Sequence, residues 1–298
     1  MHIRLMQLDE APAVASFIAR LQPDPTHQIA YFDMSPEDIV EQLRGFDTHP
    51  ACATLLAYEK ERFLGLLGLE VSAEIQRTWL YGPLISEGED WAVIADALYA
   101  QALESFIPPG YSQELFVDVQ HTRMADFAAR HGFPARPLEA SMRLDRPHAA
   151  QLPTPSTVYV LDLAHTEGFV TLHDRLFPGT YYNGQQILAR LGERDRVYIT
   201  RDEGNAVNGY IYAKVEDGPD SAYIDFLGVA EQARRKGLGS ALTCAAVGWL
   251  LTFSHVNTIA LTVRGTNTSA VALYQRLGFV LTQTLAGYRK VAPSSVTA

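Results

Sequence analysis

Two distant segments of the chain recur in a second copy at one common offset. Segment 121–133 resembles segment 267–279, which lies 146 residues further along the chain. Moving back by the same 146 residues carries Gly228, in one apolar run, onto Gly82 in another. A repeat of this length has the size of a domain, and 298 residues suffice for two domains of ordinary size. We therefore expect a tandem pair of like domains.

A proline-containing segment separates the two copies. Residues 145–156 hold three prolines and show no periodicity, which is typical of a linker. We predict a first domain over residues 1–146 and a second over residues 156–298. In both halves apolar strand patterns alternate with helical patterns, partly through antiparallel connections. This alternation predicts an α/β (α+β) fold in which a mixed sheet carries helices on both faces.

A strand in the second half is joined to a helix by a short basic loop. Residues 222–229 have the pattern of a buried strand, and residues 240–250 that of a largely apolar helix. The first amide groups of a helix lack partners within it and its dipole is positive there, so an anion is attracted. Gly237 and Gly239 allow close approach of the backbone. The loop is interpreted as a pyrophosphate cradle, with neutralising charge from Arg234, Arg235 and Lys236.

Other phosphate-binding loops fit this segment less well. A P-loop needs a lysine directly after its second glycine, where this chain has Ser240, and the dinucleotide fingerprint needs a third glycine, where it has Leu242. The pattern that remains is R-x-x-G-x-G, from Arg234 to Gly239. Taken alone, this pattern also fits an ordinary solvated helix start.

A second motif follows the next apolar strand, residues 258–263. It reads N-x-x-A-x-x-x-Y-x-x-x-G-F from Asn267 to Phe279. Asn267 can cap a helix on which Tyr274 shares one face with its apolar neighbours. A single tyrosine at such spacing is more often a core aromatic than a functional group.

In this order and at this spacing, the two motifs resemble those of the GCN5-related N-acetyltransferase (GNAT) superfamily. The resemblance implies two tandem domains, each a mixed, mostly antiparallel sheet with a splayed central strand pair. It implies acetyl-CoA, or another acyl-CoA, as co-substrate, and places Tyr274 where the departing CoA thiolate is protonated. The implied acyl-CoA contacts are Leu227, Gly228, Val229, Arg234, Arg235, Lys236, Gly237, Leu238, Gly239, Ser240, Asn267 and Tyr274.

Asp225 is the candidate general base. By the two-residue period of a strand it shares a face with Tyr223, Leu227 and Val229, and a carboxylate in an apolar strand needs a reason. An acceptor amine must lose a proton before it attacks. The superfamily often has a glutamate two residues earlier, where this chain has Tyr223. A structural or substrate-orienting role for Asp225 is the alternative.

Acceptor recognition in the resembled fold comes from the first helix-loop-helix and the last hairpin. The corresponding candidates are Tyr181, Tyr182 and Asn183 in a Pro/Gly-rich turn, together with Tyr223 and Tyr288. Ordinary loop packing is the alternative for the turn. The expected acceptor is a small-molecule amine, and its identity stays open.

The first half lacks the features that would bind acyl-CoA. Arg234, Gly237 and Gly239 correspond to Gly88, Trp91 and Val93, and acidic residues replace the basic ones. Like charge disfavours a diphosphate. Tyr274 and Asn267 correspond to Ala128 and His121. We therefore expect the first domain to be a degenerate, non-catalytic copy.

Composition limits the remaining classes. The net charge of −10 argues against nucleic acid as a partner, because nucleic-acid binding normally needs a basic face. Two isolated cysteines and nine scattered histidines predict neither a disulfide framework nor a metal site. Apolar runs of about 18 residues, the length that spans a membrane, are absent. A cytoplasmic monomer or homodimer without membrane contact is expected.

The leading hypothesis is an acyl-CoA-dependent N-acyltransferase that moves acetyl from acetyl-CoA to a primary amine by direct attack in a ternary complex. The alternative is a non-catalytic acyl-CoA-binding sensor or regulatory module. A third hypothesis, an interaction protein without CoA affinity, is disfavoured by the intact glycine loop.

Overall fold

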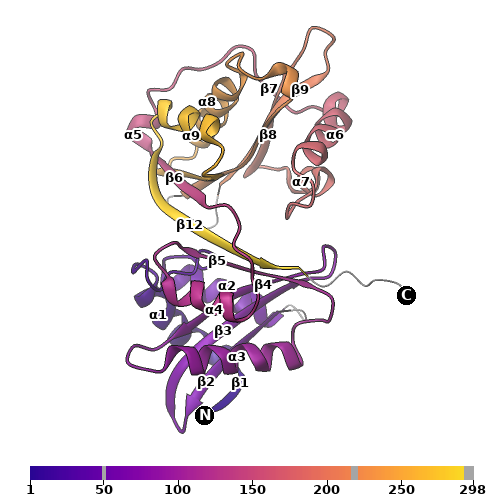
Figure 1. Cartoon of the computed structure of the whole chain (residues 1–298). Helices are drawn as coiled ribbons and strands as arrows, with labels where there is room; N and C mark the ends of the chain where they lie inside the picture. Colours follow the sequence, from indigo (N-terminus) through magenta and orange to yellow (C-terminus); the bar gives the residue numbers. More distant parts are fainter. Residues whose placement is uncertain (49–51, 216–220, 292–298) are drawn as a thin grey trace, which may run out of the picture. The chain divides into compact units, whose positions relative to one another are not determined.

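The computed structural model describes residues 1–48, 52–215 and 221–291. Contacts divide the chain into two units, the first comprising residues 1–138 and 284–298 and the second residues 139–283. The elements are labelled in Figure 1. Among the described residues, no helix is long and apolar enough to cross a membrane.

The first unit is built on one mixed sheet. Its strands, in spatial order, are β1 (His2–Leu5), β2 (Cys52–Glu59), β3 (Arg62–Ser72), β4 (Arg77–Ile85), β5 (Ser112–Asp118) and the later part of β12 (Val280–Lys290). Neighbours are antiparallel except β4 and β5, which are parallel. The helical elements are η1 (Leu8–Glu10), α1 (Ala11–Leu21), α2 (Pro36–Thr48), α3 (Trp91–Ser105) and α4 (Thr122–Arg130).

The second unit repeats this plan. Its strands, in spatial order, are β6 (Glu139–Asp145), β11 (Thr258–Arg264), β10 (Ser221–Val229), β9 (Val207–Val215), β8 (Asp195–Arg201) and β7 (Tyr159–Val160). Only β10 and β11 run parallel. The helical elements are α5 (Arg146–Ala149), η2 (Leu163–His165), α6 (Thr166–Leu176), α7 (Gly184–Arg190), η3 (Glu231–Ala233), α8 (Leu238–Leu250) and α9 (Thr268–Arg276).

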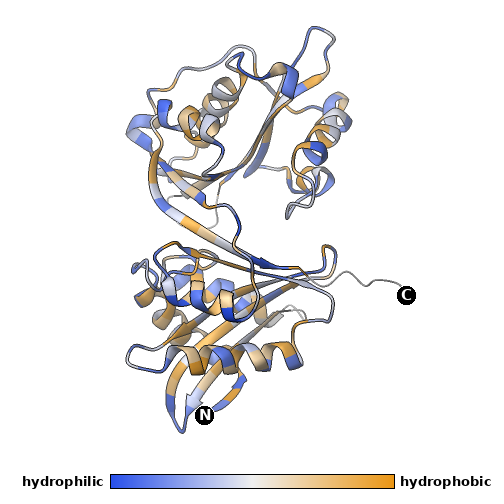
Figure 2. Ribbon diagram, viewed as in Figure 1, coloured by the Kyte–Doolittle hydropathy of each residue, from blue (hydrophilic) through white to orange (hydrophobic). Residues whose placement is uncertain are grey.

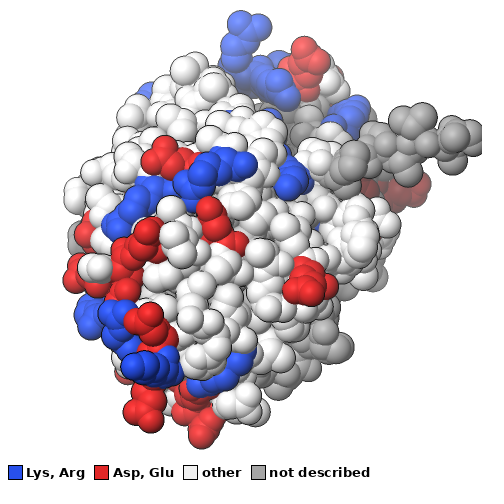
Figure 3. Space-filling model, turned by 60° about the horizontal axis from the view of Figure 1, so that its bottom comes forward, with Lys and Arg blue, Asp and Glu red and all other residues white. Residues whose placement is uncertain are grey.

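Buried apolar side chains form the cores that hold the helices of each unit against its strands. In Figure 2 the apolar residues follow the strands and the helix faces that pack on them. One buried cluster fills the first unit, and two fill the second. Acidic side chains outnumber basic ones in the chain, 34 to 24, and the two kinds lie interspersed on the face shown in Figure 3. The predicted fold class, a mixed sheet covered by helices in each of two like domains, is confirmed.

The central parallel pair of each unit separates toward its carboxyl end. In the second unit β10 and β11 pair from Ser221 and Thr258 as far as Ile224 and Leu261, although β10 continues to Val229. At Asp225 the register of β10 against β9 shifts, which marks a β-bulge. An extra residue on one strand bends it and increases its twist, and here the bend coincides with the separation. The predicted splayed strand pair is therefore present.

The units do not end where the sequence predicts the domains to end. Strand β6 lies inside the predicted first domain, 1–146, yet it pairs with β11 along its whole length. Conversely, residues 285–290 of β12 lie inside the predicted range 156–298 and pair with β5. Each sheet is thus completed by the last strand of the other half. Sequence periodicity predicts that a segment is a strand, but it does not determine with which other strand that segment pairs.

The expected linker also begins with ordered structure. Arg146, at the start of α5, donates hydrogen bonds to the carbonyl oxygens of Val256, Phe253 and Leu251 at 2.7, 2.6 and 3.2 Å. These bonds hold the segment that follows β6 to the second unit.

Candidate active site

Helix α8 starts from a left-handed glycine in the loop that follows β10 and the short helix η3. Gly237 is the N-cap residue, with φ of 80°, and Arg235 is also left-handed, with φ of 62°. A glycine cap offers no side chain to the first helical N–H groups, so these stay available to an anion. Arg234 fixes the loop to β10, because its Nε donates to the carbonyl oxygen of Val229 at 3.1 Å.

The charge at this helix start is accessible. Arg234, Arg235 and Lys236 are exposed, whereas Leu238, Gly239 and Ser240 are half-buried. Positive side chains and the positive end of the helix dipole therefore lie together. Along β10, Leu227 and Val229 are half-buried and Gly228 is buried. The predicted acyl-CoA contacts of the loop and of β10 are thus neighbours in space as well as in sequence.

Two glycines of this region have packing roles that the sequence does not reveal. A Cβ on Gly228 would lie 2.5 Å from the ring of Tyr210, and one on Gly239 would lie 2.8 Å from Leu273 Cδ1. Gly228 therefore lets β10 pass close to a buried ring. Gly239 lets α8 approach α9, and only Gly237 is needed for its backbone conformation alone.

Tyr274 lies on α9, whose first turn is capped as predicted. The side-chain oxygen of Asn267 accepts from the backbone N–H of Ala270 at 3.2 Å. Tyr274 is 5% exposed and its ring packs edge-to-face against Phe279. Burial, together with the nearby phenol of Tyr223, raises the pKa of Tyr274 above its ordinary value. The phenol is therefore protonated at neutral pH and able to donate a proton.

Asp225 lies at the bulge where β10 and β11 begin to separate. Its side chain is 3% exposed, with Lys214 Nζ 3.7 Å from Oδ2. The hydroxyl of Tyr181 donates to Oδ1 at 3.0 Å. The predicted alternation holds in burial when whole residues, backbone included, are compared: Tyr223, Asp225, Leu227 and Val229 are half-buried, and the residues between them are buried. The structure thus brings Asp225 and Tyr181 into contact although they are 44 residues apart.

The turn that carries Tyr181 is held by a histidine that sequence reasoning missed. His173 is fully buried, and its Nε2 donates to the carbonyl oxygen of Tyr182 at 2.9 Å. Because that oxygen can only accept, Nδ1 of the neutral ring accepts from the Tyr210 hydroxyl at 2.6 Å. Burial lowers the pKa of His173, which keeps this tautomer neutral. One histidine on an apolar helix face carries no sequence signal for such a role.

The other predicted acceptor contacts have structural partners. Asn183 caps α7 in a reciprocal arrangement with Gln186, and Arg190 stacks on the ring of Tyr182 at 3.8 Å. Tyr223 Oη donates to Thr262 Oγ1 at 2.6 Å, which links β10 to β11 where they start to separate.

Tyr288 is not brought together with these residues in the second unit. It lies on β12 in the first unit, opposite Leu115, and packs against that unit's core. The prediction placed it in the last hairpin of the second half, but the end of β12 belongs to the other sheet.

The corresponding helix start in the first unit holds a carboxylate. Helix α3 is capped by Asp90, whose side chain accepts from the N–H of Val93 at 3.2 Å. Glu89 next to it is paired with Arg62. The Asp90 carboxylate therefore occupies, at the start of α3, the position that is open to an external anion at the start of α8.

Comparison with known proteins agrees with this geometry. Residues 164–279, which contain both motifs, match the model of the acetyltransferase (GNAT) family. The second unit is a GNAT domain. Its family membership supports acetyl-CoA as its co-substrate. The exposed basic residues and the available N–H groups at the start of α8 suit the diphosphate of that co-substrate. In the described part of the chain, no three His, Cys, Asp or Glu side chains gather as a metal site.

Curated relatives match part of the chain. A mycothiol acetyltransferase of Salinispora tropica is 31% identical over 154 residues, which cover 46% of this chain and 50% of the relative. A mycothiol acetyltransferase of Pseudarthrobacter chlorophenolicus is 28% identical over 176 residues, covering 53% of this chain and 54% of that one. The chain therefore spans about half the length of the curated relatives it matches.

Solved structures extend the likeness to the whole chain at the level of fold. A tandem GNAT protein from the clavulanic acid biosynthesis pathway is 20% identical, with a TM-score of 0.68 and 99% of each chain covered. A GCN5-related N-acetyltransferase from Sphaerobacter thermophilus is 15% identical, with a TM-score of 0.76 over 100% of this chain and 97% of that one. The chain thus has the tandem GNAT fold, with a GNAT-like unit in each half.

Proposed function

We propose that the second unit transfers an acetyl group from acetyl-CoA to a primary amine of a small molecule. The observation that carries this proposal is the position of the α8 start. It follows the end of β10, which stays paired with β9 as far as Val229 but separates from β11 beyond Ile224. A diphosphate at the helix start would leave the rest of the cofactor to follow the separated strand toward Asp225.

The acyl-CoA contacts follow from the same geometry. Backbone N–H groups of residues 237–240 would hold the diphosphate, with Arg234, Arg235 and Lys236 neutralising its charge. The pantetheine arm would lie along residues 227–229 like an added strand. A backbone N–H near Leu227 would stabilise the charge that develops on the thioester oxygen. Asn267 and Tyr274 would complete the site from α9.

The proposed reaction moves two protons. Asp225 first takes a proton from the ammonium form of the acceptor, which frees the amine nitrogen to form a bond to the thioester carbon. The carbon–sulfur bond then breaks, Tyr274 gives its proton to the departing sulfur, and the second proton lost by the nitrogen returns to Tyr274. Holding amine and thioester together supplies most of the acceleration, since the thioester is already activated. Tyr181 and Lys214 orient the Asp225 carboxylate toward the amine.

The first unit is proposed to bind no acyl-CoA. The Asp90 carboxylate at the start of α3 already accepts one of the helix N–H groups and would repel a diphosphate. Because the curated relatives are mycothiol acetyltransferases, mycothiol-related amines are the first acceptors to test.

Calorimetric titration with acetyl-CoA tests this assignment. Gly237→Glu is compared with Gly88→Glu, a matched control, since both glycines have φ of 80° and open space around a Cβ. We expect one equivalent to bind to the native protein and to Gly88→Glu, and none to Gly237→Glu. Two equivalents, or binding that survives Gly237→Glu, would contradict the proposal. Thiol release with an amine panel then distinguishes a transferase from a sensor that binds without turnover.

A further inference from the structure

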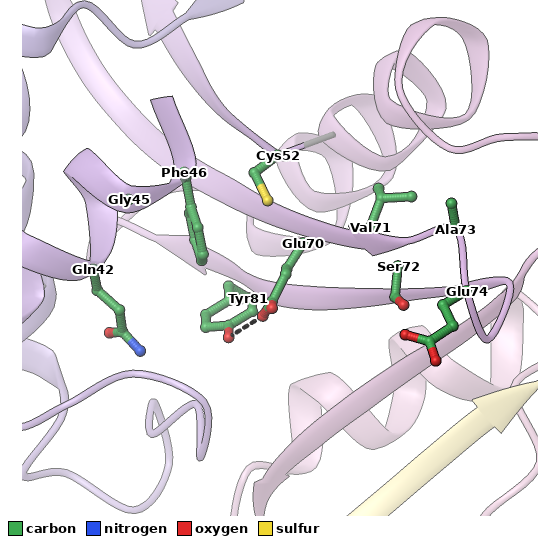
Figure 4. Close-up of a pocket in the computed structure, with 10 residues that line it drawn as sticks. All are labelled: Gln42, Gly45, Phe46, Cys52, Glu70, Val71, Ser72, Ala73, Glu74 and Tyr81. Carbon is green, nitrogen blue, oxygen red and sulfur yellow. Dashed lines mark hydrogen bonds between the residues drawn. The ribbon is translucent and has the colours of Figure 1, made fainter. Parts of the chain in front are cut away.

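The first unit contains a cavity of about 710 Å³ that the acyl-transfer proposal does not use. It lies between α2 and the strands β3 and β4, entirely within this unit, and Figure 4 shows its lining. Small-molecule sites typically have volumes of about 300–1,000 Å³. The cavity is therefore large enough for a small organic ligand.

Two aromatic rings form one wall of this cavity. Phe46 comes from α2 and Tyr81 from β4, and their rings meet edge-to-face with centroids 4.8 Å apart. Gly68 on β3 makes room for them, because a Cβ there would lie 3.0 Å from Tyr81 Cβ and 3.4 Å from Phe46 Cε2. A side chain at this position would displace the rings. The wall is thus built by specific packing.

Two carboxylates contribute the charge of the cavity. Glu70 lies near the end of β3, and Glu74 lies in the turn that follows. The Tyr81 hydroxyl donates to Glu70 Oε2 at 2.7 Å, which orients that carboxylate beside the rings. Burial, reinforced by Glu70, raises the pKa of Tyr81, so the phenol stays a donor. No lysine or arginine is among the described residues that line the cavity.

The cavity also contains a thiol, at Cys52, opposite Glu70 in the β2–β3 pair. Burial raises the pKa of this thiol, and the neighbouring Glu70 adds to the effect. The thiol is therefore neutral at physiological pH, and it contributes a soft, uncharged surface instead of a thiolate.

We propose that this cavity binds a small organic cation, an ammonium compound with a short apolar chain. The ammonium group would pair with Glu70 and Glu74 and lie against Phe46 and Tyr81, since carboxylates and aromatic faces both attract such a cation. The apolar chain would contact the rings of Phe46 and Tyr81. This site shares no lining residue with the acceptor site proposed at Asp225.

Calorimetric titration of the full-length protein with hexylammonium tests the proposal. Hexanoate and hexanol serve as probes of the same length with negative or no charge. We expect hexylammonium alone to bind, and Glu70→Gln to weaken it about tenfold or more, since the amide keeps an acceptor for Tyr81 but loses the charge. Glu87→Gln, an exposed glutamate of the same unit, is the control of equal net charge. Equal binding of all three probes, or no effect of Glu70→Gln, overturns the proposal.

A second variant, which fills the cavity, tests whether the cation binds there even if Glu70→Gln does not fold. Gly45 lines the cavity from α2, and a Cβ there meets nothing within 4 Å, so Gly45→Leu fills space without disturbing the core. We expect it to abolish binding of hexylammonium. Asp225→Asn and Gly237→Glu should leave this binding unchanged, which separates the cavity from the acyl-transfer site. Loss of binding in Asp225→Asn, or its retention in Gly45→Leu, would place the cation elsewhere and refute the assignment.

Discussion

Tyr274 is almost fully buried, and its phenol is held in the protonated form. Tyr274→Phe preserves the ring and its contact with Phe279. We expect kcat to fall about 10²-fold or more, the usual contribution of a positioned general acid, and the affinity for acetyl-CoA to change much less, because the ring that contacts it is kept. Steady-state thiol release and calorimetry measure the two quantities. An unchanged kcat would assign the acid role to another group.

Helices α4 and α9, which correspond in the sequence repeat, begin at different N-cap residues, His121 and Asn267. His121 Nδ1 accepts from the N–H of Met124 at 3.2 Å, as Asn267 Oδ1 does from Ala270. The histidine is 1% exposed, and burial lowers its pKa from 6.5 to about 4. A histidine with a lowered pKa leaves the fold unaffected above pH 6.5 and destabilises it as pH falls toward 4, because only the unfolded chain protonates readily.

His121→Asn should therefore keep the cap and remove part of the acid sensitivity. We expect the native protein to lose at most about 3 kcal/mol more unfolding free energy than the variant between pH 6.5 and 4. Urea unfolding at pH 7.5, 5.5 and 4.5 measures this difference. Parallel pH profiles for the two proteins would show that His121 does not titrate in this range.

At the level of single elements, two glycines that both stand between apolar residues, Gly228 and Gly248, differ in the space around them. A Cβ on Gly228 in β10 would lie 2.5 Å from the Tyr210 ring, whereas a Cβ on Gly248 in α8 would have nothing within 4 Å. Gly228→Ala should destabilise the second unit by about 1–3 kcal/mol through overpacking. Gly248→Ala should stabilise it by about 0.5–1 kcal/mol, because alanine favours the helix. Thermal unfolding of both variants checks the pair, and equal shifts would contradict it.

The elements around the site could be predicted to different extents. Strand 222–229, the helix after it and the Asn267 cap all follow from periodicity and capping rules. The bulge at Asp225 and the contact with Tyr181 could not be predicted, because both depend on which strand and which turn pack against β10. His173 was missed for the same reason, since its partners, Tyr210 and Tyr182, come from another strand and a loop.

At the scale of the whole molecule, the sheet of each unit contains the last strand of the other half of the chain. Ala286, in the second half, is 5% exposed in the core of the first unit, and Ala140 is 8% exposed in the core of the second. An aspartate at either position would bury an unpaired charge. The two substitutions should therefore destabilise units opposite to those that the sequence repeat suggests.

Hydrogen exchange distinguishes the two assignments. Ala286→Asp should accelerate exchange of backbone amides in β5, residues 112–118, and leave those of β10 and β11 protected. Ala140→Asp should do the reverse. If Ala286→Asp instead exposed β10 and β11, the limits 1–146 and 156–298 would describe the folding units.

The sequence by itself determined the tandem organisation, the fold class, the glycine-started helix and the two motifs of the GNAT domain. These features depend on local periodicity, on capping and on backbone conformations that particular residue types prefer, and such preferences act between neighbours in the chain. Only the tertiary structure decided which strand completes each sheet, that Tyr288 belongs to the first unit, and that Phe46, Glu70 and Tyr81 line one cavity. Those outcomes depend on contacts between segments far apart in the chain, for which one sequence carries no local signal.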